Sequence, residues 1–321
     1  IEGLGAKKIP VTVTGPLGEK VSCYYGFLEE TKSAVMEMAS AAGITLVTKK
    51  DPLRASTYGV GEMIADALKR GCKNFIIGIG GSATNDGGIG MLKALGFEFF
   101  DEDGNDVGEG AAALAKIEVI QTENKNPLLS GAKFQIACDV KNPLCGKQGA
   151  TYIFGPQKGV TEEQKSKVDE AMKHYADVTK ESLGCDFADC EGAGAAGGLG
   201  YAFLSYLAGE LIPGVELILQ ATGLEEKMKN ADVVVTGEGR LDAQTVMGKA
   251  PVGVAALAKK YNAKVIAFAG SVAPEASVCN QAGIDAFFPI VRGVTTLEEA
   301  MKKENAMENI AATAEQVFRL L

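Results

Sequence analysis

The residues best suited to do chemistry are charged side chains that follow glycines at the ends of apolar segments. The run 237–242 reads Gly-Glu-Gly-Arg-Leu-Asp, so Glu238 and Asp242 flank Arg240. Carboxylates can hold Mg²⁺ or accept a proton, and a guanidinium binds carboxylate or phosphate bidentately. A solvated surface turn would also account for these charges. The position after a largely apolar strand favours a functional interpretation, because open α/β sheets bind ligands at strand ends.

Lys249 precedes Ala250-Pro251, where the sequence predicts the start of a helix over 251–261. Proline is favoured in the first turn of a helix. A cation at that end opposes the helix dipole unless an anion neutralises it. We therefore expect Lys249 to contact an anionic ligand.

Three more charged residues lie in loops that could form part of a site. Asp86, in the run 82–88, either caps a helix or holds Mg²⁺ between phosphate oxygens. Asp139 lies at the end of another apolar strand. It is either a turn residue there or a carboxylate of the site. The run 155–159 could be a simple turn. Alternatively, its Lys158 binds phosphate.

Glycine is the unusual feature of the composition, at 40 of 321 residues against an average near ~7%. Since 46% of the chain is hydrophobic, the chain is globular and its glycines must serve local backbone needs. Glycines at 78–81, 237–239 and 270 follow predicted buried strands. We expect such loops to bind an anion, phosphate in particular, and tight turns alone are the alternative.

Composition excludes several classes of function. The 32 basic and 41 acidic residues give a net charge of −9, which is a poor footprint for nucleic acid. A single histidine, His174, argues against Ser-His-Asp and multi-histidine metal sites. Seven cysteines without CxxC spacing indicate a reduced, cytoplasmic compartment. No apolar run reaches the ~18–20 residues that span a bilayer, so we expect neither membrane nor nucleic-acid partners.

The pattern of apolar residues predicts two regions that differ in the order of their strands and helices, with the division near 222–226. Before that point the predicted strands are 11–14, 21–28, 44–48, 74–79, 97–100, 134–140 and 150–154, and the predicted helices are 31–42, 56–70, from 82 through 95, 161–183 and 201–208. After it, strands 231–235, 264–269 and 285–291 alternate with helices 251–261, 274–282 and 297–321. The later strands are nearly all apolar, as parallel strands buried on both faces should be.

Five segments, in order along the whole chain, resemble the bacterial glycerate kinase family, the glycerate 2-kinase type that is unrelated to P-loop kinases. They are GIGGSATNDGGIG at 78–90, CDVKNPLCG at 138–146, FGPQKG at 154–159, GAGAAGGLG at 192–200 and TGEGRLDAQTVMGKAP at 236–251. The resemblance implies ATP- and Mg²⁺-dependent phosphorylation of D-glycerate to 2-phosphoglycerate in glycerate or glyoxylate catabolism. It also implies two dissimilar α/β domains with the site in the cleft between them.

The expected domains are a mixed-sheet α/β domain over 1–224 with glycine-rich loops, and a Rossmann-like parallel three-layer sandwich over 225–321. Family members open with an Asp-Ser-Phe-Lys motif and an Ala-Asp-Gly-Gly-Glu-Gly loop, neither of which this sequence contains. Three clear strands make a small parallel sheet. We therefore expect an N-terminal segment absent from this chain to complete the second domain.

The resulting site hypothesis joins charged residues and glycine loops in phosphoryl transfer. Its catalytic candidates are Asp86, Asp139, Glu238, Arg240, Asp242 and Lys249, with Asp86 and Asp242 as metal ligands. Candidates for binding ATP phosphates or glycerate are Gly80, Gly81, Ser82, Asn85, Gly87, Lys158, Gly197, Gly198, Gly237, Gly239, Gly270 and Ser271.

Two other functions remain open at this point. The run 78–83 fits G-x-G-x-x-A, so an NAD-linked oxidoreductase is one alternative. A non-catalytic protein that binds small anions through the same loops is the other. The oligomeric state, a homodimer included, does not follow from the sequence.

Overall fold

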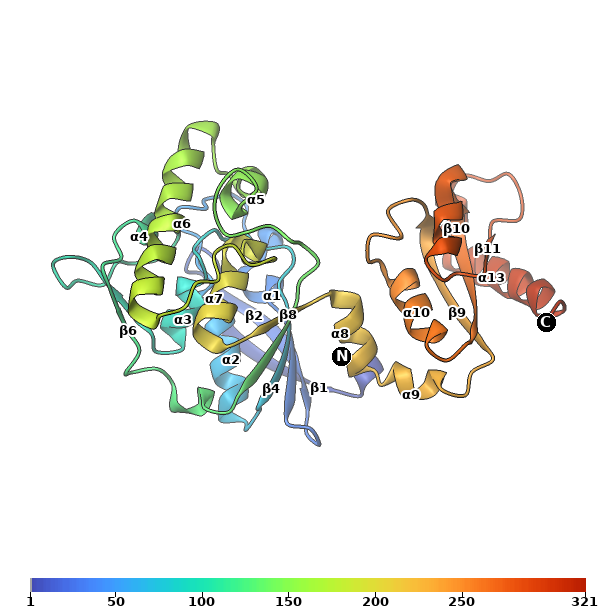
Figure 1. The fold of residues 1–321 in the computed structure, drawn as a ribbon, viewed down its shortest axis with the longest axis horizontal. Coiled ribbons are helices and arrows are strands. Elements are labelled where there is room, and N and C mark those ends of the chain that lie inside the picture. The colour runs from blue at the N-terminus through green and yellow to red at the C-terminus, as the bar shows by residue number, and fades with distance from the viewer. Residues whose placement is uncertain (1) are drawn as a thin grey trace. The chain divides into compact units, whose positions relative to one another are not determined.

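The computed structural model describes residues 2–321, which form two compact units (Figure 1). Unit 1 ends at Gly214, and unit 2 runs from Val215 to Leu321. The division comes earlier than the expected boundary at 224/225. The reason is that Leu219 and Leu224 already pack against the hydrophobic core of unit 2.

Unit 1 is built on a six-stranded mixed sheet with the order β1-β2-β3-β4-β7-β8. Its strands are β1 (Lys7–Thr14), β2 (Lys20–Leu28), β3 (Ser33–Glu37), β4 (Asn74–Gly78), β7 (Lys133–Ala137) and β8 (Glu210–Ile212). The β1–β2 pair is antiparallel, as predicted, whereas β3, β4, β7 and β8 pair in parallel. A separate antiparallel pair joins β5 (Glu98–Phe100) to β6 (Val119–Gln121).

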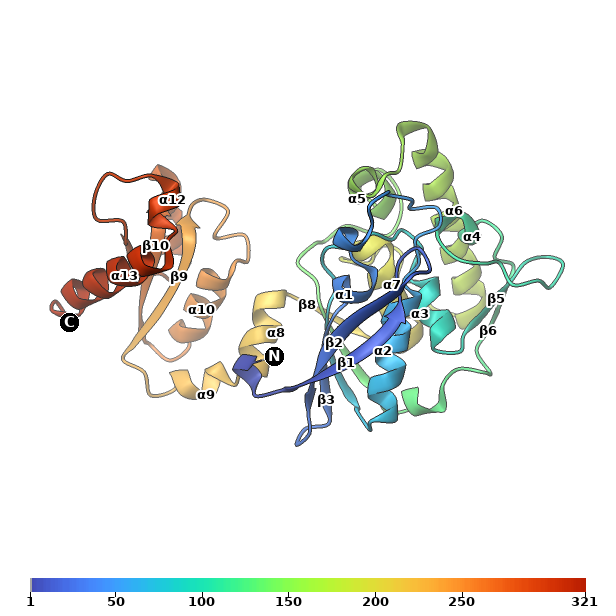
Figure 2. The same ribbon diagram turned by 180° about the vertical axis from the view of Figure 1, so that it is seen from behind.

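The helices of unit 1 cover the buried face of this sheet. Alternate residues of β1 and β4 are buried, namely Ile9, Val13, Phe75 and Ile77, as expected for strands with one covered face. Helix α2 packs on β1 (Figure 2), and α7 packs on β7 and β8. The helices are α1 (Ala39–Ala42), α2 (Tyr58–Lys69), α3 (Ile89–Ala94), α4 (Ala111–Leu114), α5 (Ala150–Lys158), α6 (Glu162–Leu183) and α7 (Leu199–Leu207), with 3₁₀ turns at Glu2–Leu4, Ile44–Leu46, Pro127–Leu129 and Ala195–Gly197.

Unit 2 is a three-layer α/β sandwich around a parallel sheet with the order β11-β10-β9. Residues of α10 such as Ala255 and Ala258 pack on one face of the sheet, and Val317 of α13 packs on the other (Figure 1). The strands are β9 (Val233–Leu241), β10 (Lys264–Val272) and β11 (Ala286–Pro289). The helices are α8 (Gly214–Ala221), α9 (Leu224–Met228), α10 (Ala250–Lys259), α11 (Val278–Gln281), α12 (Leu297–Ala300) and α13 (Lys303–Phe318), with a 3₁₀ turn at Pro274–Ser277.

The helix predicted over 31–42 was wrong. This segment forms strand β3 and the single-turn helix α1. The helical composition of the segment is overridden because β3 lies inside the sheet, between β2 and β4, where Ala34 and Met36 are buried. The neighbouring strand predicted over 44–48 is a 3₁₀ turn instead.

Several boundaries near the glycine motifs also differ from the prediction. The strand predicted over 150–154 is part of helix α5, which accommodates Pro156 and ends at Gly159 with φ +105°. The helix predicted from residue 82 begins only at Ile89, so 79–88 is an extended loop. Strand β9 continues to Leu241, so the run 237–242 is largely strand rather than turn. The helix predicted over 297–321 is broken at Met301 and Lys302 into α12 and α13.

Gly197 offers a test of how closely two glycine loops of unit 1 pack. Its φ is +73°, and a Cβ there would lie 2.1 Å from the carbonyl oxygen of Thr84. We expect Gly197→Ala to lower the free energy of unfolding by about 2–4 kcal/mol, through left-handed strain and displaced backbone. Gly184 has φ +69° and open space around it, so Gly184→Ala should cost only about 1 kcal/mol. Equal losses in denaturant titrations would contradict this packing.

Candidate functional site

A cavity of about 230 Å³ opens in unit 1 where β4 and β7 end. Loop residues that follow these two strands form one wall, and α5 with the 3₁₀ turn at 195–197 forms another. Its lining residues are Ile79, Gly80, Gly81, Ser82, Ala137, Cys138, Asp139, Val140, Phe154, Gln157, Lys158, Ala195 and Ala196. The structure thus brings together five predicted site residues, namely Gly80, Gly81, Ser82, Asp139 and Lys158.

Lys158, the last residue of α5, is a buried cation in the wall of this cavity. Only 2% of its surface is exposed. Its Nζ donates to the carbonyl oxygen of Thr84 at 2.7 Å, which is its one hydrogen bond among residues 2–321. Burial lowers the pKa of Lys158 to about 7, and the negative charge of Asp86 opposes that shift. Lys158 can therefore supply further N–H donors to an anion that enters the cavity.

The loop after β4 contributes backbone donors to the same cavity. Among the described residues, the N–H groups of Gly80 and Gly81 donate no hydrogen bond, and the hydroxyl of Ser82 has no partner. Gly81 has φ +73°. Consecutive free N–H groups at such a bend form a concavity suited to an oxyanion. Opposite them, Ala196 holds φ +53°, a conformation that is uncommon for a residue with a side chain.

Asp139 is the carboxylate of this cavity. Its Oδ1 accepts the N–H of Gly214 at 2.7 Å, which fixes the side chain after β7. Asp139 is otherwise exposed, so its second oxygen can meet a ligand. Burial raises the pKa of the adjacent Cys138 thiol, which keeps that sulfur neutral.

Asp86 lies in a different environment from the one expected of a metal ligand. Its side chain is fully buried and lies outside the cavity lining. Its oxygens accept the N–H and hydroxyl of Thr57 and the N–H groups of Gly88 and Gly90. Burial raises the pKa of Asp86, and these four donors act against that shift. Asp86 therefore holds the loop after β4 against the start of α2, buried and outside the cavity lining.

Other predicted loop residues also serve packing. Asn85 donates to Thr151 inside the protein. Gly87 donates its N–H to the carbonyl of Gly197 at 2.9 Å, and a Cβ on Gly198 would lie 2.7 Å from the Cα of Gly87. These glycines allow two loops to approach each other, and they support the cavity rather than line it.

In unit 2, four predicted residues gather at the end of β9. Lys249 Nζ lies 3.6 Å from Oδ1 of Asp242 and 4.0 Å from Oε2 of Glu238. Arg240 Nε lies 4.0 Å from Asp242, and 67% of its side chain is exposed. The two carboxyl side chains are only 18% and 20% exposed. The cluster thus contains two largely buried carboxylates and two loosely paired cations.

This arrangement changes the interpretation of Lys249. It is the N-cap residue of α10, and the anions that offset its charge there are Asp242 and Glu238 of the same chain. The spacing of about 4 Å leaves the ammonium free to contact a phosphate as well.

The glycines at the ends of β9 and β10 play different parts. A Cβ on Gly237 would lie 2.4 Å from the carbonyl of Phe268, and one on Gly270 would lie 2.7 Å from that of Gly239. Both are therefore required by close strand pairing. Gly239 and Ser271 are exposed, and a Cβ on Gly239 would meet open space, so these two positions can face a ligand.

Among residues 2–321, no group of three or more histidine, cysteine or acidic side chains is placed to hold a metal ion. Mg²⁺ often binds through only one or two carboxylates together with substrate phosphates and water. Glu238 and Asp242 form such a pair of hard oxygen donors within reach of one ammonium. The described donors therefore fit Mg²⁺ that arrives with a phosphate ligand.

Three residues that the sequence did not single out lie beside these groups, and two of them, Thr245 and Thr57, position them. Thr245 is fully buried, donates to Glu238 and accepts the N–H of Asp242. Thr57 holds Asp86 and also accepts the N–H of Met91. Glu37 ends β3 beside Gly78, and burial raises its pKa. Thr245 could have been found from its place three residues after Asp242, whereas the wrong helix over 31–42 hid Glu37.

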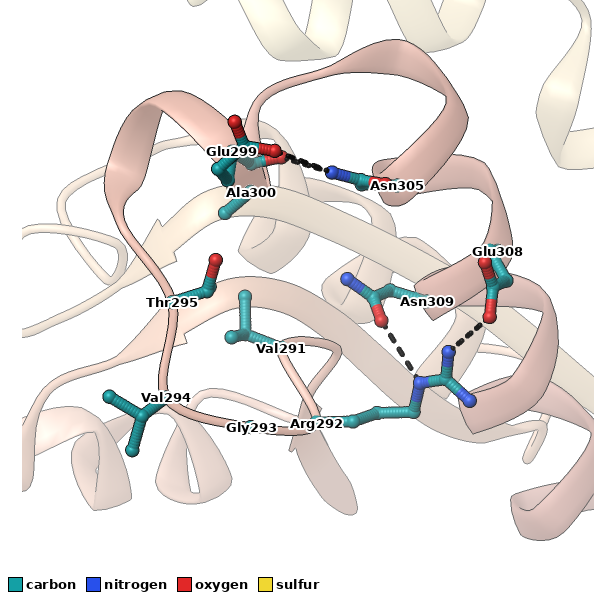
Figure 3. Close-up of a pocket in the computed structure, with 10 residues that line it drawn as sticks. All are labelled: Val291, Arg292, Gly293, Val294, Thr295, Glu299, Ala300, Asn305, Glu308 and Asn309. Carbon is teal, nitrogen blue, oxygen red and sulfur yellow. Dashed lines mark hydrogen bonds and ion pairs between the residues drawn. The ribbon is translucent and has the colours of Figure 1, made fainter.

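A second cavity, of about 240 Å³, lies in unit 2 between the loop after β11 and helices α12 and α13 (Figure 3). Its one cation, Arg292, donates to Glu308 and Asn309 at 2.8 and 2.9 Å. Val294 of the same loop is fully exposed. Since its cation is already paired, this cavity is less suited to an anion than the one in unit 1.

Comparison with known proteins identifies the family. The model of the glycerate kinase family matches residues 1–321. The chain belongs to the glycerate kinase family. It is 45% identical to a glycerate kinase of Bacillus subtilis strain 168, over 99% of this chain and 83% of the relative. It is 46% identical to a glycerate 2-kinase of Escherichia coli K12, over 94% of this chain and 81% of the relative.

A solved structure supports the same assignment. A crystal structure from Salmonella typhimurium LT2, whose protein carries a provisional glycerate kinase 2 assignment, superposes with a TM-score of 0.87 at 42% identity. The match covers 99% of this chain and 85% of that chain. The predicted family, the enzyme class and the two dissimilar α/β folds are confirmed. No helix among residues 2–321 is long and apolar enough to cross a bilayer.

This glycerate kinase family chain lacks the context that an NAD fingerprint requires. In that fingerprint the glycine loop leads straight into a helix whose N-terminus binds pyrophosphate. Here the run 78–83 continues as loop to residue 88, and α3 then spans only Ile89–Ala94. The oxidoreductase alternative therefore finds no support in the fold.

The buried amine of Lys158 predicts a characteristic dependence of stability on pH. Its pKa is about 7 in the folded protein and 10.5 in the reference state, so between these values the unfolded chain binds more protons. Lys158 thus makes stability rise with pH across that window. We expect Lys158→Met to be more stable than wild type at pH 7, by an amount that shrinks toward pH 10. Urea titrations at several pH values measure this difference, and a constant difference would contradict the assignment.

Proposed function

We propose that this kinase transfers the γ-phosphoryl group of ATP to the C2 hydroxyl of D-glycerate, giving 2-phosphoglycerate and ADP. The family match over residues 1–321 carries the proposal. Phosphoryl transfer depends on positioned donors and on charge neutralisation more than on covalent chemistry. The cavity of unit 1 and the charged cluster of unit 2 supply groups of both kinds.

The proposed step is a simple displacement. The glycerate hydroxyl gives its proton to a carboxylate of the enzyme while its oxygen forms a bond to the γ-phosphorus. The bond between that phosphorus and the bridging oxygen breaks, and ADP leaves with the electron pair. The proton then passes from the carboxylate to solvent.

We assign the phosphates of ATP to the cluster at the end of β9. Glu238 and Asp242 would hold Mg²⁺ there, and the ion, when bound, neutralises phosphate charge. Arg240 is exposed and loosely paired, so its guanidinium can reach a phosphate oxygen. Lys249 stays close to both carboxylates and contributes the second cation. Thr245, buried behind the carboxylates, fixes their orientation.

The product distinguishes this proposal from its alternatives. Enolase acts directly on 2-phosphoglycerate, so with D-glycerate, ATP and Mg²⁺ we expect absorbance from phosphoenolpyruvate without added phosphoglycerate mutase. A signal that requires the mutase would indicate phosphorylation at C3. Ligand-induced stabilisation without ADP release would indicate a binding protein.

Asp242 is the most direct single test of the cluster in unit 2. Asp242→Asn should lower kcat about 10²- to 10³-fold, because a neutral amide would hold Mg²⁺ less tightly and the ion would then neutralise less of the phosphate charge. The exposed Asp232, just before β9, provides the matched control, and Asp232→Asn should keep near-wild-type kcat. Steady-state kinetics with ADP detection measure both variants. A near-wild-type kcat for Asp242→Asn at unchanged thermal stability would remove this residue from the site.

A further inference from the structure

The cavity of unit 1 raises a narrower question, namely which of the two substrates it receives. Pockets for drug-sized ligands usually span about 300–1,000 Å³, so a cavity of about 230 Å³ fits a molecule of few heavy atoms better than a nucleotide. Its polar groups are also unevenly placed. Donors come from the loop after β4 and from the end of α5, and the carboxylate of Asp139 follows β7.

Resting on the proposed function, we infer that this cavity is the acid-binding site, in which Lys158 and the N–H groups of Gly80 and Gly81 hold the carboxylate of a three-carbon hydroxy acid and Asp139 receives its hydroxyl proton. The nucleotide phosphates are left to the cluster in unit 2. Unit 1 by itself then determines which acid is phosphorylated.

The cavity contains hydrogen-bond donors that are not fully used. An ammonium carries three donors, and Lys158 uses one of them, on the carbonyl of Thr84. The N–H groups of Gly80 and Gly81 are likewise without acceptors among the described residues. A carboxylate offers two oxygens to these donors, and bonds of this charge-assisted kind are the strong ones.

The cavity also contains one carboxylate that is held in place. Asp139 is held by the N–H of Gly214, so one oxygen is anchored and the other is left for the substrate. In a hydroxy acid the hydroxyl lies one carbon from the carboxylate. An acid anchored by Lys158 can therefore present that hydroxyl to a base in the same small cavity.

The charges around Lys158 decide how binding depends on pH. Asp86, on the loop before α3, acts on Lys158 directly, and Asp139 shares the cavity. The turn at 195–197 contributes only Ala195 and Ala196 to the lining. On α6, Asp169 is engaged with the N–H of Gly146. Since the pKa of Lys158 is about 7, wild-type affinity for the acid should fall as pH rises above 7.

The test is a calorimetric titration of the whole chain with D-glycerate, without nucleotide, at pH 6 and pH 8.5. We expect binding at pH 6 that weakens about tenfold or more at pH 8.5. Lys158→Met should weaken binding at pH 6 by roughly 10- to 100-fold and remove the dependence on pH. Lys147 is exposed, so Lys147→Met is the matched control and should bind like wild type.

Gly80→Ala provides a second variant that should fold normally. A Cβ at Gly80 meets no atom within 4 Å, so the methyl group enters the cavity without strain. It should weaken glycerate binding about tenfold at unchanged thermal stability. Gly3 has equally open surroundings, and Gly3→Ala should change neither quantity.

A parallel titration with ADP and with inorganic phosphate identifies the source of any anion bound in the cavity. If Lys158→Met leaves glycerate binding intact and instead weakens ADP or phosphate, the cavity serves the nucleotide and the inference is overturned. Unchanged binding of all three ligands also overturns it. The proposed function still holds in either case if the enzyme releases ADP when it is supplied with glycerate and ATP. If wild type itself releases no ADP, the proposed function fails separately.

Discussion

The arrangement of the cavity in unit 1 depends on one buried cation, Lys158. Burying a lysine side chain is costly unless its amine is neutral or its ammonium form is paired with an anion. Lys158 is buried with one carbonyl as its hydrogen-bond acceptor. Because burial disfavours the charged ammonium, the pKa of Lys158 falls to about 7. An arrangement that is costly in the free protein becomes favourable when an anion completes the pairing. The cavity beside Lys158 provides the space for one.

The surrounding structure holds this amine in place. Asp86 accepts four donors and ties the loop after β4 to the start of α2. Gly87 and Gly197 allow the next loop to pack against it. Thr84, whose carbonyl receives Lys158, lies between these fixed points. Asp86, a catalytic candidate in the sequence, and Gly87 and Gly197, candidates for ligand binding, thus support the segment that holds Lys158.

Much of this protein could be predicted from its sequence, and the failures share a physical cause. Buried parallel strands such as β4 and β10 were found because their apolar character is continuous. The glycine motifs identified the family, and the run 237–242 with Lys249 contains the charged residues that gather at the end of β9. Strand β3 was missed because its place inside the sheet outweighs the helix propensity of its residues. The burial of Asp86 and Lys158 was missed because motif spacing does not show whether a charged side chain points into the interior or toward solvent. Thr245 was overlooked because its place three residues after Asp242 does not by itself show that its hydroxyl is buried against the carboxylates.

The two units divide the chemistry of a kinase in this account. Unit 2 gathers two carboxylates and two cations at the end of β9, a composition suited to phosphates with Mg²⁺. Unit 1 offers a small cavity with one buried cation, free N–H groups and one anchored carboxylate, which suits a small hydroxy acid. Selectivity for the acid and affinity for the nucleotide would then respond to substitutions in different units.

The most direct test of this account is the pKa of Lys158 itself, followed by NMR in protein labelled with ¹³C at the lysine ε-carbon. The Lys158 resonance, assigned by its loss in Lys158→Met, should titrate near pH 7 in the free protein. Saturating D-glycerate should raise that pKa by at least one unit, because the bound carboxylate stabilises the ammonium. A pKa near 10.5 in the free protein, or a value that D-glycerate does not change, would contradict the account.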